Sequence, residues 1–359
     1  MNLKQIHLCF IGNMLGRNAG YITTQGQILA DLFAVEGYRI TCVSSKINRI
    51  KRLAEITQTL ITGFRTFDIV LLDTFSGLSF IIADVTSLLC KILNLPLIMI
   101  LRGGNLPEFI KKHPRWVKRV LRRADILVAP SPFLAKKIGE SGFEISVVTN
   151  IVDIGKYPFR ERSKISPRLI WMRSFHPVYN PEMAVKVLAR LRESEPGATL
   201  TMAGADKGLE ADIKRMAEEM NLREAVRFAG FLDLKKKIIE FSAADIYINT
   251  NHIDNMPVSV VEARALGLPV VATNVGGLPF LIEHMENGML VPDGDVDSMV
   301  RNIKILLDNP ELTKKISRNG RELAELSDWH AVRHIWEMIF SDLLSSDAGK
   351  ALNVKPNQY

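Results

Sequence analysis

Two carboxylates, Asp254 and Glu262, stand eight positions apart within the stretch 249–295. A short helix is predicted to begin after Asp254 and to contain Glu262, because Pro257 suits the first helical position and Gly267 suits the position just beyond the last turn. The start of a helix presents unpaired N–H groups and a partial positive charge, both of which attract anions. These residues therefore predict a seat for a phosphate group, with carboxylates beside it that accept hydrogen bonds from hydroxyl groups.

Strands and helices alternate along the rest of the chain. Apolar strands are predicted at 6–11, 38–44, 69–73, 97–101, 126–129 and 146–149, and again at 169–172, 200–203, 226–228, 246–249 and 269–272. Strands interleaved with helices predict parallel sheets covered on both faces. The fold class is therefore α/β, with two doubly wound, Rossmann-like domains facing each other across a cleft. Ligands in such sheets lie beyond the carboxyl ends of the strands.

A charged segment without periodicity separates the two halves of this pattern. It predicts a first domain over 1–153, a linker over 154–167 and a second domain over 168–329. A final helix over 330–345 has an apolar stripe that we expect to pack back on the first domain. The remaining residues, 346–359, are predicted to form a flexible tail.

The composition of the chain indicates a folded protein without a membrane span or a disulfide framework. The 359 residues are 47% hydrophobic and 24% charged, which is typical of a folded protein. The stretch 69–101 is broken by charges and a proline, so it indicates strand, helix and strand rather than a membrane span. The N-terminus enters a strand pattern at once, so no signal peptide is predicted. Three widely spaced cysteines predict no disulfide or metal framework, and a cytoplasmic location follows: Cys9, Cys42 and Cys90.

The loop after the first strand contains Gly12, Gly16 and Gly20. It could bring backbone close to a phosphate, or it could serve only as a turn. The spacing G-x3-G-x3-G differs from the G-x-G-x-x-G of dinucleotide-binding proteins. No acidic residue ends the second strand, and both observations argue against an NAD-dependent oxidoreductase.

The stretch from Asp254, DNMPVSVVEARALGLPVVATNVGGLP, resembles a known family signature. The signature is E-x-x-P/G-x-x-x-x-E-A-x-A-x-G-x-P-V-V-x-T-x-x-G-G-x-P, found in the family-four retaining glycosyltransferases of the GT-B fold (glycosyl transferases group 1). Arg173 after a strand, the run GFLDLKKKIIEFSAADIYINTN from Gly230, and ADILVAPSPFLAKKIGESGFE followed by VVTNIVD extend the resemblance. It covers most of residues 5–345.

The resemblance implies a role for each matching position. Glu262 would bind the ribose hydroxyls of a nucleotide, Asp254 the hydroxyls of the transferred sugar, and Arg173 the diphosphate. These three form the expected catalytic set. The backbone of Asn255, Met256, Pro257 and Val258 would complete the donor site. Gly20 would approach the phosphates from the first domain.

The implied activity is retaining transfer of a hexose-type sugar from a nucleotide-sugar donor to a hydroxyl of a glycan or lipid-linked acceptor. Surface polysaccharide or glycolipid assembly is the expected setting. Arginine and helix-end donors would stabilise the leaving group, so neither a metal nor another cofactor is expected. Three alternatives stay open. They are an epimerase-like enzyme of the same fold, a pyridoxal-phosphate phosphorylase, for which no Schiff-base lysine is evident, and a catalytically weakened nucleotide-sugar-binding protein.

The chain departs from the family pattern at four places. Asp254 replaces the usual Glu, and Phe280 replaces the Glu that follows Gly-Gly-x-Pro. Asn180 stands nearest to the place of a usual Lys and suits a helix N-cap, so His176, Lys207 or another residue would have to supply the cation. A usual His is replaced by residues that we expect to alter recognition on the acceptor side: Arg102, Gly103, Gly104 and Asn105.

A basic segment runs from Lys111 to Arg123, with seven Lys or Arg and no acid. It predicts either a surface helix that packs one apolar face on the first domain, or attachment to anionic lipid, which a tryptophan among cations favours. Attachment would make the protein peripheral on the inner face of the membrane. No nucleic-acid-binding module accompanies the charge. The residues of this candidate membrane surface are Lys111, Lys112, Arg115, Trp116, Lys118, Arg119, Arg122 and Arg123.

Overall fold

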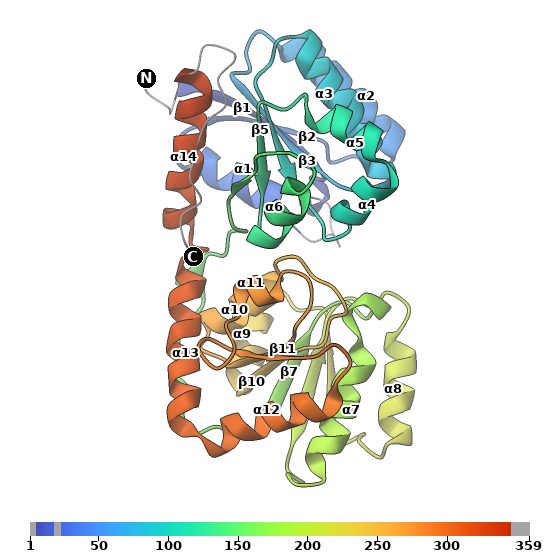
Figure 1. Ribbon diagram of the computed structural model, residues 1–359, viewed down its shortest axis with the longest axis vertical. Coiled ribbons are helices and arrows are strands. Elements are labelled where there is room, and N and C mark those ends of the chain that lie inside the picture. Colours follow the sequence, from blue (N-terminus) through green and yellow to red (C-terminus); the bar gives the residue numbers. More distant parts are fainter. Residues whose placement is uncertain (1–4, 18–22, 346–359) are drawn as a thin grey trace. The chain divides into compact units, whose positions relative to one another are not determined.

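The computed structural model describes residues 5–17 and 23–345, and it divides into two compact units (Figure 1). The first unit contains the chain up to Ile151 together with the last helix from Trp329, and the second unit runs from Val152 to Asp328. Each unit is built on a parallel sheet of six strands. The predicted class, α/β with two doubly wound sheets, is confirmed.

The sheet of the first unit has the order β2-β1-β3-β4-β5-β6. All of its strand pairs are parallel. β1, β3 and β4 are completely buried because helices cover both faces, which is why their sequences are continuous apolar runs. The strands are β1 (His7–Ile11), β2 (Arg39–Val43), β3 (Ile69–Thr74), β4 (Leu97–Leu101), β5 (Ile126–Ala129) and β6 (Ser146–Val147).

Helices of the first unit cover the two faces of its sheet unequally. One face packs against α2 (Arg49–Gly63), α3 (Phe80–Ile92), α4 (Leu106–Lys112), α5 (Pro114–Leu121) and α6 (Pro132–Gly139). The other face packs against α1 (Gln25–Val35) and α14 (Trp329–Ser345). Trp329, Trp336 and Phe340 of α14 are buried in that second layer, so the last helix belongs to the first unit, as predicted. Short 3₁₀ turns lie at Leu15–Arg17 and Gly77–Ser79.

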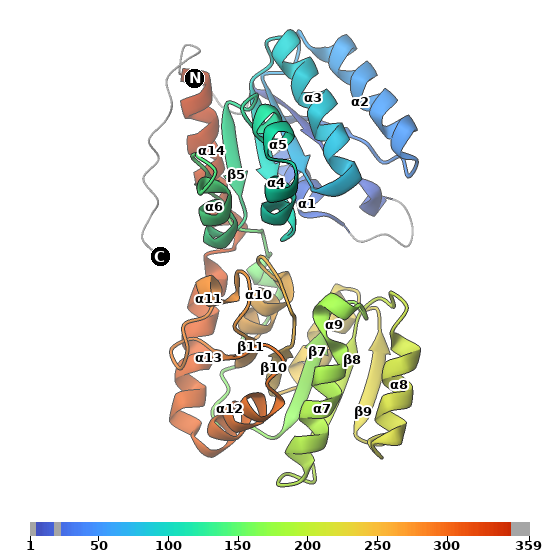
Figure 2. The same ribbon diagram turned by 45° about the vertical axis from the view of Figure 1, so that its right-hand side comes forward.

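The sheet of the second unit has the order β12-β11-β10-β7-β8-β9. Counted within the unit and read from the β9 edge, this is 3-2-1-4-5-6, the order of dinucleotide-binding sheets. The direction of winding reverses between β7 and β10, which pair directly and lie side by side (Figure 2). The strands are β7 (Arg168–Met172), β8 (Thr199–Ala203), β9 (Val226–Gly230), β10 (Ile246–Asn249), β11 (Val270–Thr273) and β12 (Met289–Val291).

Two helical layers enclose the second sheet. One contains α7 (Pro181–Arg192), α8 (Glu210–Glu219) and α12 (Val296–Asp308), and α13 (Pro310–Glu325) adds Ile316 to it. The other contains α9 (Leu234–Ala243), α10 (Val258–Ala265) and α11 (Leu278–Leu281). Two further 3₁₀ turns lie at Ile154–Lys156 and Pro177–Tyr179.

Three sequence-based boundaries differ from the structure. The segment 154–167 was predicted as a linker, yet it packs within the second unit, where Ile154 and Tyr157 join the core and Arg162 is buried. Strand β12 was not predicted because its three residues are too few to show periodicity. The final helix begins at Trp329, one residue earlier than predicted. Gly20 and the predicted tail 346–359 lie outside the described residues.

Candidate donor site in the second unit

The predicted charged residues of the second unit gather where its winding reverses. Arg173 directly follows β7, and Asp254 follows β10 by five residues. Because these two strands are neighbours and parallel, their carboxyl ends bring both side chains to one edge of the sheet. The two residues are 81 positions apart in the sequence, and the topology of the sheet brings them together.

Arg173 and Asp254 form a shielded ion pair. The Arg173 Nη2 to Asp254 Oδ2 distance is 2.5 Å, and the two side chains are 16% and 12% exposed. Burial is the largest influence on the pKa of the Arg173 guanidinium and lowers it, but Asp254, Tyr179 and Tyr247 together more than offset this, so the net shift of the pKa is upward. Arg173 is thus a fixed cation at this edge of the sheet.

Neighbouring side chains hold this pair in place. Asn251 Nδ2 donates to Asp254 Oδ2 over 2.6 Å, and the Asn255 backbone N–H donates to Asp254 Oδ1 over 2.8 Å. The guanidinium of Arg173 lies over the ring of Tyr179, 4.2 Å from its centroid. Since these contacts come from the loops after β7 and β10, small shifts of either loop would move the pair.

A buried threonine joins these two loops. Thr250 Oγ1 lies 2.9 and 2.8 Å from the carbonyl oxygens of Tyr179 and Asn180, and Trp171 Nε1 donates to it over 2.9 Å. Asn180 itself caps α7, because its side chain accepts a hydrogen bond from the Met183 N–H. Its predicted structural role is confirmed, and the residue does not supply the cation that the family pattern places nearby.

Helix α10 begins beside Asp254, but one residue later than predicted. Pro257 is its N-cap, and Val258 is the first helical residue. The first N–H groups of a helix have no acceptor four residues earlier in it, so a helix start at this edge suits an anion. The end of α10 is as predicted. Gly267 has a φ of +81°, and its N–H donates to the Arg264 carbonyl while the Leu268 N–H donates to that of Ala263.

The double glycine after β11 lies against the acidic loop. A Cβ added at Gly276 would come within 2.1 Å of the Asp254 carbonyl oxygen, and one at Gly277 within 1.7 Å of the Asn255 carbonyl oxygen. The Gly277 N–H donates to the Asp254 carbonyl over 2.8 Å. The two glycines therefore allow the loops after β10 and β11 to pack backbone to backbone.

We expect Gly277→Ala to lower the free energy of unfolding of the second unit by about 3 kcal/mol, because the new Cβ displaces the acidic loop. Nucleotide binding should weaken at the same time. Gly197→Ala is the matched control, since a Cβ there meets nothing within 4 Å. Thermal unfolding and nucleotide titration of both variants test this. Equal stability and equal nucleotide affinity of the two variants would show that the loops can move apart without a cost in free energy.

Glu262 lies within α10 and is buried, at 5% exposure. Its Oε1 accepts hydrogen bonds from the Tyr157 hydroxyl over 2.8 Å and from Lys237 Nζ over 2.6 Å. Burial, followed by the charge of Glu262, raises the pKa of the Tyr157 hydroxyl, so it remains a donor. Both partners bond to one carboxylate oxygen, an arrangement that orients the carboxylate.

The sequence analysis missed both partners of Glu262. Tyr157 lies in the segment expected to be a linker, and Lys237 is one of three consecutive lysines on α9 that no periodicity distinguishes. Lys236 is exposed, whereas the Lys237 side chain is only 19% exposed because it turns toward the carboxylate. The family pattern indicated that a usual lysine is missing near Asn180, but it did not indicate which other residue supplies a cation.

Arg264, two residues after Glu262, points into the interior. It is 1% exposed, and it donates to the Leu281 carbonyl over 2.9 Å and to the Asn287 carbonyl and side-chain oxygens over 3.0 and 2.6 Å. Burial lowers the pKa of its guanidinium to about 9. These bonds fasten the segment after α11 to α10. Phe280, where the family pattern has Glu, lies on α11 and is 45% exposed.

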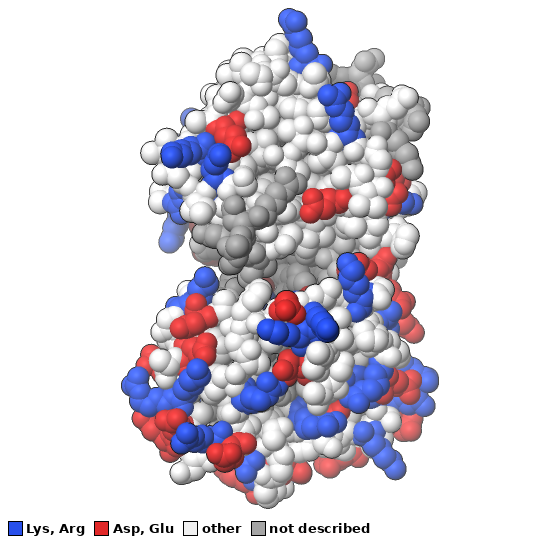
Figure 3. Space-filling model, turned by 180° about the vertical axis from the view of Figure 1, so that it is seen from behind, with Lys and Arg blue, Asp and Glu red and all other residues white. Residues whose placement is uncertain are grey.

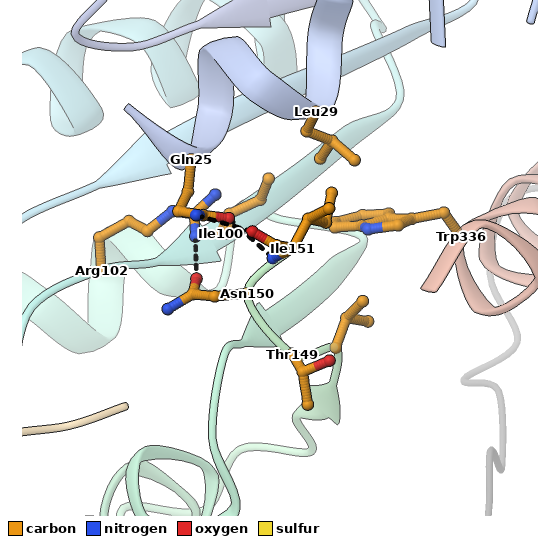
Figure 4. A pocket seen from close by; sticks show the side chains of 9 residues that line it. Gln25, Leu29, Ile100, Arg102, Thr149, Asn150, Ile151 and Trp336 are labelled. Carbon is orange, nitrogen blue, oxygen red and sulfur yellow. Dashed lines mark hydrogen bonds between the residues drawn. The ribbon is translucent and has the colours of Figure 1, made fainter. Parts of the chain in front are cut away.

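The residues predicted for the acceptor side lie in the first unit. Arg102 follows β4, and its guanidinium contacts Asp73 Oδ1 over 2.8 Å and Asn150 Oδ1 over 3.0 Å. It borders a small cavity into which Trp336 points from α14 (Figure 4). Gly103, Gly104 and Asn105 form the turn into α4. The guanidinium is thus held by the first unit itself.

Comparison with known proteins connects this geometry to a family. Residues 156–323, nearly all of the second unit, match the family described as Glycosyl transferases group 1. The second unit therefore resembles the group 1 glycosyltransferases. A group 1 glycosyltransferase was the resemblance inferred from the acidic stretch, and it is confirmed.

Two curated relatives are similar to this chain. A glycogen synthase of Mycobacterium tuberculosis is 28% identical over 221 residues, covering 59% of this chain and 53% of the relative. The lipopolysaccharide core biosynthesis glycosyltransferase LpsE of Rhizobium meliloti is 26% identical over 209 residues, covering 56% of this chain and 59% of the relative. The matches thus span little more than half the length of either relative.

A solved structure shows the same fold. The crystal structure of Anabaena Alr3699/HepE in complex with UDP superposes with a TM-score of 0.73 at 18% identity, covering 94% of this chain and all of that one. This likeness establishes the GT-B fold for this chain.

Proposed function

We propose that this protein is a retaining glycosyltransferase that moves a sugar from a nucleotide-sugar donor to a hydroxyl group of a glycan or lipid-linked acceptor. The observation that supports it best is the meeting of Arg173, Asp254 and the start of α10 at the switch point of the second sheet. A cation and a helix start at one place suit a diphosphate leaving group.

Each residue of the donor site has a proposed task. Arg173 and the first N–H groups of α10 stabilise the charge that develops on the leaving diphosphate, without a metal. Asp254 accepts hydrogen bonds from hydroxyls of the transferred sugar, and Glu262 from those of the ribose. No side chain acts as nucleophile, since retention proceeds on the front face and the leaving phosphate oxygen takes the proton of the acceptor hydroxyl.

Lys237 is a further member of this site in our proposal. It is the cation nearest to the nucleotide-binding carboxylate, 2.6 Å from Glu262 Oε1. A largely buried ammonium here orients Glu262 and offsets part of the negative charge that a nucleotide diphosphate brings. It thus supplies the cation that Asn180 does not.

We expect Lys237→Met to weaken nucleotide diphosphate binding about 10-fold, because one charge-assisted hydrogen bond to Glu262 is lost. Lys236→Met, on the exposed neighbour, is the matched control and should bind as the unmodified protein does. Isothermal titration with UDP, GDP and ADP measures both. Unchanged affinity in the Lys237 variant would remove this residue from the site.

The proposed reaction is tested by incubating purified protein with UDP-, GDP- and ADP-sugars and a membrane extract, with and without chelator. We expect chelator-resistant release of nucleotide and a labelled glycan whose anomeric configuration matches that of the donor. Inverted configuration would reject retention, and loss of activity with chelator would reject metal independence. Nucleotide binding without turnover would instead favour a weakened binding protein.

The setting of the reaction is also a proposal. A similar protein is named for lipopolysaccharide core biosynthesis, which favours a role in surface polysaccharide or glycolipid assembly. Within residues 5–17 and 23–345, no helix combines the length and apolar character needed to cross a bilayer. We propose that the protein works in the cytoplasm, at the inner face of the membrane.

A further inference from the structure

Helix α3 exposes an apolar stripe on the first unit. Leu78, in the 3₁₀ turn before the helix, is 69% exposed, and Ile81, Leu88 and Ile92 are 45%, 45% and 65% exposed. The spacing 78, 81, 88, 92 places them on one side of the helix. The opposite side, with Phe80, Ala83 and Cys90, is buried in the core. An outer helical face is ordinarily polar, so this contiguous apolar stripe indicates an interaction site.

Two cationic helices contact α3, one on either side (Figure 2). The α2 side brings exposed isoleucines at 47, 50 and 61. The cations of the three helices far outnumber their acids: Arg49, Lys51 and Arg52 on α2, Lys91 on α3, and Arg115, Lys118 and Arg119 on α5. Charged side chains are sparse on the face of the first unit seen in Figure 3, so this unit is not uniformly basic.

Both acids on these helices are already engaged within the first unit. Glu55 accepts a hydrogen bond from the Ser44 hydroxyl. Asp84 accepts from Arg123 Nη1 over 2.6 Å and from Arg119 Nη2 over 3.3 Å. Both acids are also half-buried, so the exposed charged side chains of these three helices are cations.

Trp116 does not take part in the way that the basic segment suggested. Its ring packs edge-on to Phe80, with centroids 5.0 Å apart, and its Nε1 donates to Asp84 over 2.6 Å. The tryptophan thus fastens α5 to α3 instead of facing solvent. Of the eight residues predicted for a membrane surface, Lys118, Arg123 and Trp116 are half-buried, and the other five are exposed.

We propose that the face formed by α2, α3 and α5 docks on an anionic lipid bilayer. Leu78, Ile81, Leu88 and Ile92 enter the interfacial layer, and the flanking cations contact the headgroups. Charge complementarity selects this occupant. A second copy would bring like charges together around the stripe, whereas an anionic bilayer satisfies the cations and the apolar side chains at once. The inference is independent of the donor site, which lies in the other unit.

Vesicle flotation with 70% phosphatidylcholine and 30% phosphatidylglycerol tests this, using the full chain. The pair Leu88→Ser with Ile92→Ser and the pair Arg115→Glu with Arg122→Glu should each reduce binding at least 10-fold. Val35→Ser, at an exposed apolar residue of α1, and Lys164→Glu with Arg223→Glu, at exposed cations of the second unit, are the matched controls. They should bind as the unmodified protein does, and vesicles of pure phosphatidylcholine should bind at least 10-fold less.

Three further measurements keep the outcome decisive. Thermal unfolding should be unchanged in all four variants, which shows that they fold, and unchanged nucleotide binding separates this proposal from the proposed transfer activity. Sedimentation velocity gives the mass of each variant in solution. Absence of vesicle binding by the unmodified protein would overturn the proposal. So would full binding by either pair, or a change of oligomeric mass in the serine pair with vesicle binding retained.

Discussion

Arg173→Ala is expected to lower kcat/KM for sugar transfer by about 100- to 1,000-fold, the usual loss when one fixed electrostatic stabiliser is removed from a shielded site. The alanine leaves Asp254, at 12% side-chain exposure, without its cation and removes the charge that faces the leaving diphosphate. Steady-state kinetics of nucleotide release measures the loss. A variant that keeps more than a third of the activity would remove Arg173 from the catalytic set.

Two controls separate this effect from general damage. Arg190→Ala removes an exposed arginine of the same unit, whose partners Glu193 and Asp297 are themselves exposed, and it should change neither activity nor stability measurably. Arg173→Ala with Asp254→Ala removes both members of the buried pair. If the double variant recovers stability but not activity, the pair is required for the reaction beyond its contribution to folding.

Glu262→Ala is expected to weaken nucleotide binding about 100-fold, because hydrogen bonds to an ionised carboxylate contribute roughly 1.5–3 kcal/mol each. The substitution also leaves the Tyr157 hydroxyl and the Lys237 ammonium without their shared acceptor. Titration with nucleotide diphosphates gives the affinity, and differential scanning calorimetry gives the stability. Unchanged affinity would contradict the assigned role.

A companion pair of variants identifies which part of the loss is local. Glu262→Gln keeps an acceptor for Tyr157 but removes the charge, so we expect a smaller loss of stability than in the alanine variant. Combining Glu262→Gln with Lys237→Met removes the buried pair together. Because the two side chains contact each other, their effects on affinity should be less than additive.

The sequence singled out some residues of the donor site but not the residues that support them. The family resemblance indicated Arg173 and Asp254, and the structure brings the two together because β7 and β10 are parallel neighbours that end at the same edge. Neither Tyr157 nor Lys237 could be placed in this way. Their contacts with Glu262 span 105 and 25 residues and depend on how the segment before β7 and helix α9 pack on α10.

In the first unit, too, the sequence did not predict which elements pack against one another. An amphipathic pattern predicted that α5 has one apolar face, but the pattern alone does not say which neighbour that face meets. Trp116 packs against Phe80 and Phe109. The exposed stripe of α3 was hidden in the sequence, because a helix that is apolar on both sides has the same composition as one that is fully buried.

The hydrogen bonds of Arg264 have a consequence for how the second unit opens. This cation lies in the interior of the unit, and the carbonyl groups of Leu281 and Asn287 are its acceptors. If the segment 281–287 detached alone, it would leave an unsolvated charge without acceptors, which is far costlier than exposing an ordinary loop. The segment should therefore not fray by itself, although it lies between a one-turn helix and an edge strand. It unfolds with α10 as one cooperative block, and the rigidity of the donor loop extends well beyond the residues that contact the ligand.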